Sequence, residues 1–144
     1  MANEIRILTI DDYDDILNVW TLAGLPFKPN GRDSRELMSV EMDNPNCIFY
    51  GMFDNDKLLG VVIGNFDGRR GWINRLAIIP DYRGKNLGQL LIDITEQYLY
   101  DIGAKVICAL IEDINYPSVS SFQKAGYKCE DEIKYFVKRP GPEM

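Results

Sequence analysis

The hydrophobic pattern changes character at Pro80. Before it, alternating and apolar positions predict a short strand at 5–8, two helices, and then three strands in succession. The β-rich runs 47–53 and 58–66 are joined by a short polar turn, which predicts an antiparallel hairpin, and the run 72–79 adds a third strand. Three consecutive strands without an intervening helix predict a meander.

Two predicted helices precede this meander. Apolar residues spaced three and four apart over 16–23 lie on one helical face, and a glycine follows them. Residues 25–32 contain two prolines and a glycine, so we expect a loop there. Asp33 and Glu36 have the spacing of a capping box, which predicts a second helix ending near residue 42.

The chain after Pro80 reads as helix, strand and helix. One apolar face extends from Leu87 to Ile102 and stops at Gly103. A short apolar strand follows at 106–111, and the last helix is predicted at 117–125. A strand, a crossover helix and another strand predict a parallel pair with a right-handed connection.

The C-terminal residues are expected to return to the sheet. Residues 127–129 and 133–138 have the composition of closing strands, and residues 139–144 are expected to fray. A length of 144 residues fits one domain, so we expect a single domain over residues 1–144.

Charge and composition exclude several function classes. The formal net charge is −6, and nucleic-acid binding depends on an excess of cations, so a general nucleic-acid binder is not expected. That charge suits a cationic or amine-bearing partner, and it equally suits simple solubility. The chain has no histidine, which excludes Ser-His-Asp and Cys-His catalysis and leaves Asp, Glu, Lys, Tyr, Cys or water as acids and bases.

Metal and membrane chemistry find no support in the sequence. The three cysteines lie far apart and form no CxxC pair, so neither a zinc site nor a disulfide framework is predicted, and we expect no metal. No signal sequence and no run of about 20 apolar residues occurs, so we expect a cytoplasmic protein without membrane contact.

Candidate chemistry concentrates in the segment Arg83-Gly84-Lys85-Asn86-Leu87-Gly88, between a predicted strand and an amphipathic helix. Glycines let a backbone approach a ligand, and the first amides of a helix bind phosphate. A tight turn with solvated cations is the alternative interpretation. The GxxxxGK[ST] and GxGxxG nucleotide motifs are absent.

Residues 76–91 resemble motif A of the GNAT superfamily of acyl-CoA-dependent N-acyltransferases, written [QR]xxGx[GA]. Arg83 and Gly88 match the ends of that motif, whereas Asn86 replaces its first glycine. Asparagine tolerates the left-handed backbone region, so weaker rather than absent cofactor binding is expected. Asn115 together with residues 121–127 resembles the family's N…[FY]xxxG[FY] segment.

The resemblance implies a fold and an activity. The fold is α/β (α+β), with a mixed, mostly antiparallel sheet of six to seven strands, about four helices and a splayed parallel pair at the cofactor site. The activity is transfer of an acetyl group from acetyl-CoA to a primary amine of a small molecule, peptide or protein, by direct attack in a ternary complex. Homodimers are frequent in the superfamily, but no hydrophobic pattern outside the expected core demonstrates one here.

The resemblance also implies cofactor contacts. A strand backbone would pair with the pantetheine arm, the motif loop would hold the pyrophosphate, and Asn115 would contact the arm from the other side or cap the last helix. The implied cofactor residues are Leu76, Ala77, Ile78, Arg83, Gly84, Lys85, Asn86, Leu87, Gly88, Asn115 and Phe122.

The usual acid and base of the family are missing. Relatives often carry glutamates where this chain has Trp72 and Leu110, and a tyrosine where it has Phe122. The substitutes that we consider are Glu112 as a base acting through water, Tyr116 or Tyr135 as thiolate acid, and Asn74 as an orienting group.

Each substitute has a structural alternative. A strand-end carboxylate accounts for Glu112, and pairing within the sheet accounts for Asn74. The loop residues Phe27, Arg32 and Asp33 are candidates for amine recognition, or else form a hydrophobic plug with helix caps. A non-catalytic acyl-CoA-binding module and a purely structural domain are the competing functions.

Overall fold

The computed structural model describes residues 3–144, which build a twisted sheet with helices on both faces. The strand order is β1-β2-β3-β4-β5; neighbours are antiparallel except for the parallel pair β4 and β5. The strands are β1 (Asn3–Ile7), β2 (Cys47–Asp54), β3 (Lys57–Phe66), β4 (Gly71–Ile78) and β5 (Ile107–Cys108). The hairpin and the meander predicted from the sequence are therefore present.

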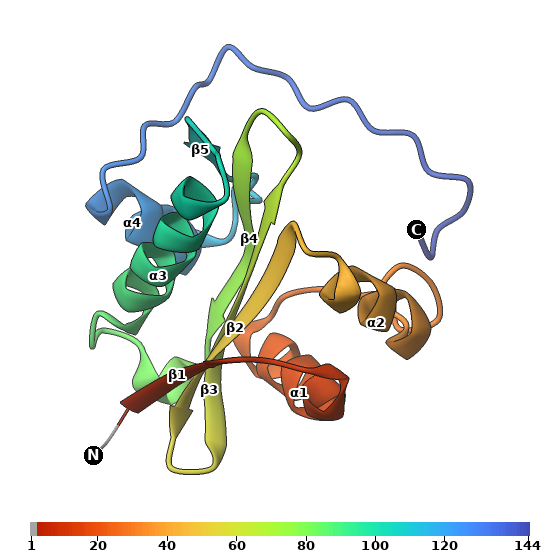
Figure 1. Cartoon of the computed structure of the whole chain (residues 1–144), viewed down its shortest axis with the longest axis vertical. Helices are drawn as coiled ribbons and strands as arrows, with labels where there is room; N and C mark the ends of the chain where they lie inside the picture. The colour runs from red at the N-terminus through yellow and green to blue at the C-terminus, as the bar shows by residue number, and fades with distance from the viewer. Residues whose placement is uncertain (1–2) are drawn as a thin grey trace.

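The helices form two layers around the sheet, with α1 and α2 on one side and α3 and α4 on the other (Figure 1). Apolar side chains of α1, such as Trp20, and of α3, such as Leu91, are fully buried against the two faces. The helices are α1 (Tyr13–Ala23), α2 (Arg35–Asp43), α3 (Leu87–Asp101) and α4 (Tyr116–Lys124), with 3-10 turns at Ile10–Asp12 (η1) and Pro80–Tyr82 (η2). None of the helices described within residues 3–144 has the length and apolar character needed to cross a bilayer.

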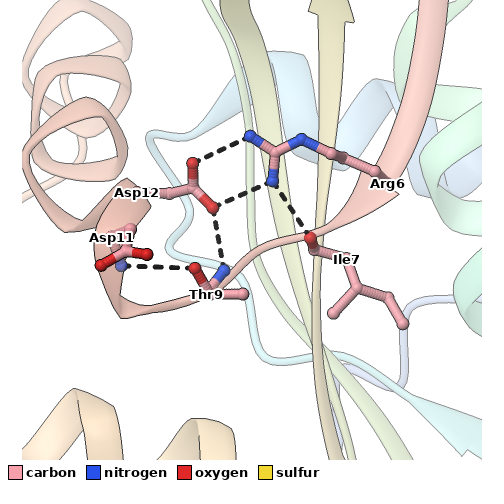
Figure 2. Close-up of polar contacts among 5 residues, drawn as sticks. All are labelled: Arg6, Ile7, Thr9, Asp11 and Asp12. Carbon is pink, nitrogen blue, oxygen red and sulfur yellow. Dashed lines mark hydrogen bonds and ion pairs between the residues drawn. The ribbon is translucent and has the colours of Figure 1, made fainter.

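An ion pair joins β1 to the start of α1 (Figure 2). Both terminal nitrogens of the Arg6 guanidinium donate to the Asp12 carboxylate at 3.0 Å, and the backbone N–H of Thr9 donates to Asp12 Oδ2 at 2.8 Å. Thr9 Oγ1 accepts in turn from the N–H of Asp11. These contacts complete a capping box at the start of the 3-10 turn η1, which leads directly into α1.

The start of α2 lies one residue beyond the predicted cap. Ser34 is the N-cap, and its hydroxyl accepts from the N–H of Leu37 at 3.2 Å. The Asp33 carboxylate instead accepts from the N–H of Lys28 at 2.8 Å, within the preceding loop. The capping-box prediction at Asp33 is wrong because loop closure engages that side chain before the helix begins.

The parallel pair is shorter than predicted. Only Gly71 with Ile107 and Trp72 with Cys108 pair in register, so β5 ends where residues 106–111 were expected to continue. Beyond these positions no strand of the described residues pairs with β4 on that side. The two strands therefore splay apart, and the end of β4 lines a pocket together with α3 and α4.

The predicted closing strands at 127–129 and 133–138 do not form, so the part of the chain that the structure describes has five strands instead of six or seven. Residues 128–140 are exposed and run in extended form past β5 toward the side of α2 (Figure 1). Within the described residues 3–144, no strand pairs with them. The chain end expected to fray makes a contact: the carbonyl of Glu143 accepts from the N–H of Arg32 at 3.2 Å.

Candidate functional site

A pocket of about 180 Å³ lies between the end of β4, the start of α3 and α4. Its walls come from four places in the sequence that the fold brings together. They are Ala23, Leu25, Leu76, Ala77, Ile78, Tyr82, Arg83, Gly84, Asn86, Leu87, Gly88, Gln89, Asn115, Pro117, Ser118, Ser120, Ser121 and Lys124.

The loop before α3 presents its backbone to this pocket. Gly84 has φ of +81° and Asn86 has φ of 62° with ψ of 20°, so the chain turns through the left-handed region on both sides of Lys85. Asn86 is the N-cap, yet its side chain makes no capping hydrogen bond, and the first turn of α3 carries no acidic residue. The free amides at this end of α3 therefore suit an anion.

Basic side chains surround the loop in an otherwise acidic chain. Arg83 and Lys124 line the pocket, whereas Lys85 lies outside the lining. Arg83 Nε donates to the carbonyl of Ile78 at 3.1 Å, and one Nη donates to the carbonyl of Ala23 at 3.4 Å. Its guanidinium thus spans the mouth between β4 and the end of α1.

The opposite wall is built from α4. Asn115 caps this helix by accepting from the N–H of Ser118, at 3.4 Å, as its capping alternative predicts, and it also lines the pocket. Ser118 is buried, and its hydroxyl donates to the carbonyl of Leu76 at 3.0 Å. Gln89 of α3 donates to the carbonyl of Ser121 at 2.6 Å.

Nine of the eleven residues expected at a cofactor line this one pocket. Sequence reasoning missed the serines of α4 and the residues at the end of α1. Ser118 and Ser121 lie three residues apart and so on one face of the helix, which was the available signal. Their placement against β4 is a tertiary contact that spacing alone does not give.

Phe122 and the two other apolar replacements lie away from the pocket lining. The Phe122 side chain is 4% exposed and packs edge-on against Tyr127, with ring centroids 5.0 Å apart. Burial, together with the hydrogen bond to Glu96, raises the pKa of Tyr127. Trp72 donates to Asp67 at 3.0 Å, and the Leu110 side chain is exposed.

The three candidate catalytic side chains do not converge. Glu112 is exposed and lies four residues beyond the end of β5 at Cys108, so it does not belong to that strand. Tyr116 is exposed at the first position of α4. Asn74 donates to Asn65 across β3 and β4 at 3.3 Å, which is the sheet pairing considered as its alternative. None of the three lines the pocket.

The candidate acceptor residues are engaged within their own loop. Phe27 packs against Trp20, with ring centroids 6.0 Å apart, as a plug. Arg32 donates to the carbonyl of Met144 at 3.3 Å, and the backbone carbonyl of Asp33 accepts from the hydroxyl of Tyr13 at 2.6 Å. These three residues shape the loop beside the pocket mouth rather than the pocket itself.

Arg75 was not identified from the sequence, and it anchors that loop to β4. Its guanidinium lies 4.2 Å from the ring centre of Trp20 and donates to the carbonyl of Pro26 at 2.8 Å. Burial lowers the pKa of Arg75, partly offset by the nearby charge of Asp33. Its backbone φ of 57° coincides with an irregular register between β3 and β4.

Comparison with known proteins identifies the class to which this fold and pocket belong. Residues 13–127 match the Acetyltransferase (GNAT) family, and the chain belongs to that family. An acetyltransferase of Sodalis glossinidius (strain morsitans) is 26% identical over 138 residues, which cover 94% of each chain. The family and the fold place the chain among the acyltransferases.

Solved structures share the same fold. The PaiA N-acetyltransferase from Thermoplasma acidophilum, in complex with coenzyme A, has a TM-score of 0.75 at 24% identity and covers 92% of this chain and 94% of its own. A ribosomal-protein-alanine N-acetyltransferase from Brucella melitensis has a TM-score of 0.72 at 14% identity and covers 96% of this chain and 99% of its own. The GNAT fold class expected from the motifs is thereby confirmed.

Proposed function

We propose that residues 1–144 form one GNAT domain that transfers an acetyl group from acetyl-CoA to a primary amine. The observation that carries the proposal is the pocket between the end of β4, the start of α3 and α4, which brings a phosphate-suited helix end beside the strand backbone at 76–78. The relatives named as acetyltransferases, and the coenzyme A complex of the Thermoplasma neighbour, support the choice of donor. The acceptor is a small amine or a peptide amine, and we place the reaction in the cytoplasm.

The residues of the pocket have separate roles in this proposal. The left-handed turn at Gly84 and Asn86 and the first amides of α3 hold the pyrophosphate, with Arg83 and Lys124 supplying positive charge. The backbone of 76–78 faces the pantetheine arm on one side, and Asn115 faces it on the other. Because Ser118 and Arg83 already hold carbonyls of this strand, the arm uses the donors and acceptors that remain.

Acetyl transfer then proceeds by positioning rather than through a dedicated acid and base. The neutral amine attacks the thioester carbon, the C–S bond breaks, the amine proton passes to water, and the thiolate takes a proton from water. Losing the ammonium proton near pH 7 costs on the order of 4–5 kcal/mol, and positioning is able to supply that much. Glu112, Tyr116 and Asn74 remain candidates for assisting these steps.

Calorimetric titration with acetyl-CoA tests the binding site. We expect the wild type to bind and Gly84→Glu to lose about tenfold or more in affinity, because a carboxylate at the pocket would repel the pyrophosphate. Gly68→Glu is the matched control: Gly68 also has a positive φ with open space around it, but it lies in the turn between β3 and β4. Equal losses in both variants, or no heat with the wild type, would refute the binding proposal.

A panel of amines then tests catalysis. Mass spectrometry of mixtures of acetyl-CoA, protein and amine should show acetylated product above the rate without protein. A non-catalytic acyl-CoA-binding module is the alternative, favoured by the burial of Phe122 and by the absence of an acid or base from the lining. Binding without product across small amines and peptides would support that module.

A further inference from the structure

Arg75 of β4 carries a half-buried guanidinium that no acidic side chain neutralises by direct contact. Only one of its terminal nitrogens donates a hydrogen bond, to the carbonyl of Pro26 at 2.8 Å. Its Nε is buried without a hydrogen-bond partner, and the ion pairs within the described residues 3–144 do not include it. Because buried cations are ordinarily paired, the free N–H groups of this guanidinium suit an anion from outside the chain.

The backbone of β4 is irregular at Arg75. Ala77 pairs with Val61 of β3. The next pair joins Asn74 to Ile63, so β4 holds one residue more than β3 over this stretch. Such a bulge re-aims a side chain, and Arg75 lies within it at a φ of 57°. A non-glycine residue in the left-handed region is strained, and strain of this kind gathers at binding and catalytic sites.

The guanidinium is fixed in position next to the pocket. Its central carbon lies 4.2 Å from the ring centre of Trp20, and its hydrogen bond to Pro26 sets its direction. The chain neighbours of these two anchored residues, Leu76 after Arg75 and Leu25 before Pro26, both line the pocket. A guanidinium held by stacking is preorganised, so little side-chain entropy is lost when an anion binds to it.

The charges around Arg75 favour an ammonium group close to that anion. Burial lowers the pKa of Arg75, and the positive charge of Arg32 adds to this effect. The charges of Asp33, Glu112 and Glu41 oppose it from a distance, since none of them forms an ion pair with the guanidinium. A molecule with both an amino group and a carboxylate meets both signs of charge, whereas a simple alkylamine leaves the guanidinium unpaired.

We propose that Arg75 selects the amine acceptor by binding its carboxylate, so that the preferred acceptors are amino acids or similar amines that carry a carboxylate. This inference rests on the proposed acetyl transfer and adds the substrate class to it. The N–H groups that remain free on a guanidinium hold a carboxylate through two parallel hydrogen bonds. Because Arg75 directly precedes residues 76–78, an amino group a few bonds from that carboxylate stays beside the proposed acetyl donor.

Paired substrates test the selection. Each pair is an amino acid and its primary amide, offered with acetyl-CoA to the wild type, Arg75→Met and Arg75→Lys. We expect Arg75→Met to lower kcat/KM for amino acids about tenfold or more relative to their amides, chiefly through KM, because a charge-assisted contact is lost. The amide also changes the reactivity of the amine itself, but equally for every variant, so this effect cancels in the ratio. Arg75→Lys should keep part of the preference, since it retains the charge without the planar fork.

Arg35→Met is the matched control. The guanidinium of Arg35 also stacks on a ring, 4.8 Å from the ring centre of Tyr13. It also donates to a backbone carbonyl, that of Ile10 at 3.4 Å, but it already has a carboxylate partner in Asp14. This variant should keep the wild-type ratio. Circular dichroism shows whether each variant is folded, and Arg75→Lys carries the comparison if Arg75→Met is not. An equal ratio in the wild type and both Arg75 variants would overturn the proposal.

Binding without catalysis is measured through Trp20. In a Trp72→Phe background Trp20 is the single tryptophan, and its ring contacts the guanidinium of Arg75. N-acetyl amino acids, the products of the proposed reaction, should change its fluorescence saturably at constant ionic strength, whereas their amides should not. Arg75→Met should abolish the response and Arg35→Met should keep it.

The two measurements separate this inference from the proposed function. A saturable response to the N-acetyl amino acids without any acetylated product would sustain the carboxylate site and refute the transferase. Acetylated products formed without preference for the amino acid, and without a fluorescence response, would sustain the transferase and overturn the role of Arg75.

Discussion

The ion pair between Arg6 and Asp12 should contribute measurably to the free energy of unfolding. Asp12→Asn preserves the shape of the side chain but removes the negative charge that accepts from both nitrogens of Arg6. The amide oxygen still accepts from the N–H of Thr9 once it is turned toward that group. The substitution therefore isolates the charge-assisted pair.

The expected loss follows from the exposure of the two partners. Hydrogen bonds to charged groups contribute about 1.5–3 kcal/mol each when well shielded. The Asp12 side chain is 11% exposed, but that of Arg6 is 45% exposed, so solvent screens the pair. We expect a loss of about 1–2 kcal/mol in the free energy of unfolding, which lowers the melting temperature by roughly 3–6 °C.

The dependence of this loss on pH supplies the sharper test. The hydrogen bonds from Arg6 lower the pKa of Asp12, against the opposing effect of burial. A carboxyl with a lowered folded-state pKa contributes stability above its unfolded pKa of about 3.9, and that contribution disappears as pH falls through the folded pKa. The difference between wild type and Asp12→Asn should be constant from about pH 7 to 5 and shrink below about pH 4.

Calorimetric melts of both proteins from pH 7 to pH 3 measure this difference. Asp14→Asn is the control, because the Asp14 side chain is 87% exposed and lies 3.5 Å from Arg35. That variant should differ from the wild type by less than about 0.5 kcal/mol at every pH. A difference for Asp12→Asn that is equally large at pH 3 and pH 7 would refute the reasoning.

Three further predictions concern the pocket and the thiols. Gly88→Val should weaken acetyl-CoA binding about tenfold or more in calorimetry, because an added Cβ would lie 2.9 Å from Ser121 Oγ inside the pocket; unchanged affinity would place the ligand elsewhere. Asn86→Ala should lower the free energy of unfolding by about 1 kcal/mol while Asn86→Gly stays near the wild type, because of these two only alanine is strained at a φ of 62°. Melting temperatures of the three proteins measure this difference, and equal losses in both variants would contradict the role of the left-handed backbone. Burial raises the pKa of the Cys47 thiol to about 12. Ellman's reagent at pH 8 should therefore label the exposed Cys129 in the folded protein, and Cys47 only after unfolding in guanidinium. Rapid labelling of Cys47 in the folded protein would contradict this prediction.

Local pattern predicted most of the fold, because most elements are bounded by local signals. The glycine after Ala23 does end α1, with Gly24 at φ of 79°, and the polar turn before Lys57 does close the hairpin. The extent of β5 was not predictable in this way. Whether residues 109–111 join a ladder depends on how far β4 and β5 diverge, and that is a property of the sheet.

In the candidate site too, the local features were predictable from the sequence and the long-range contacts were not. The motif loop is local, so the left-handed backbone expected to be tolerable at Asn86 is present. The contact of Ser118 with Leu76 and that of Arg75 with Pro26 join residues 42 and 49 positions apart. No rule based on residue spacing predicts contacts at such sequence separations. The prediction of closing strands was wrong for a related reason, because a strand-like composition does not determine whether another strand lies alongside.

The splay of β4 and β5 has a consequence for amide hydrogen exchange. Only two residue pairs tie β5 to the sheet, so β5 and α4 should open together well before the meander unfolds globally. Amides of 107–124 should then exchange much faster than those in the centre of β3, and a molecule bound between β4 and α4 should slow them selectively. The part of the fold that forms the pocket is thus also the part whose opening free energy a ligand changes most.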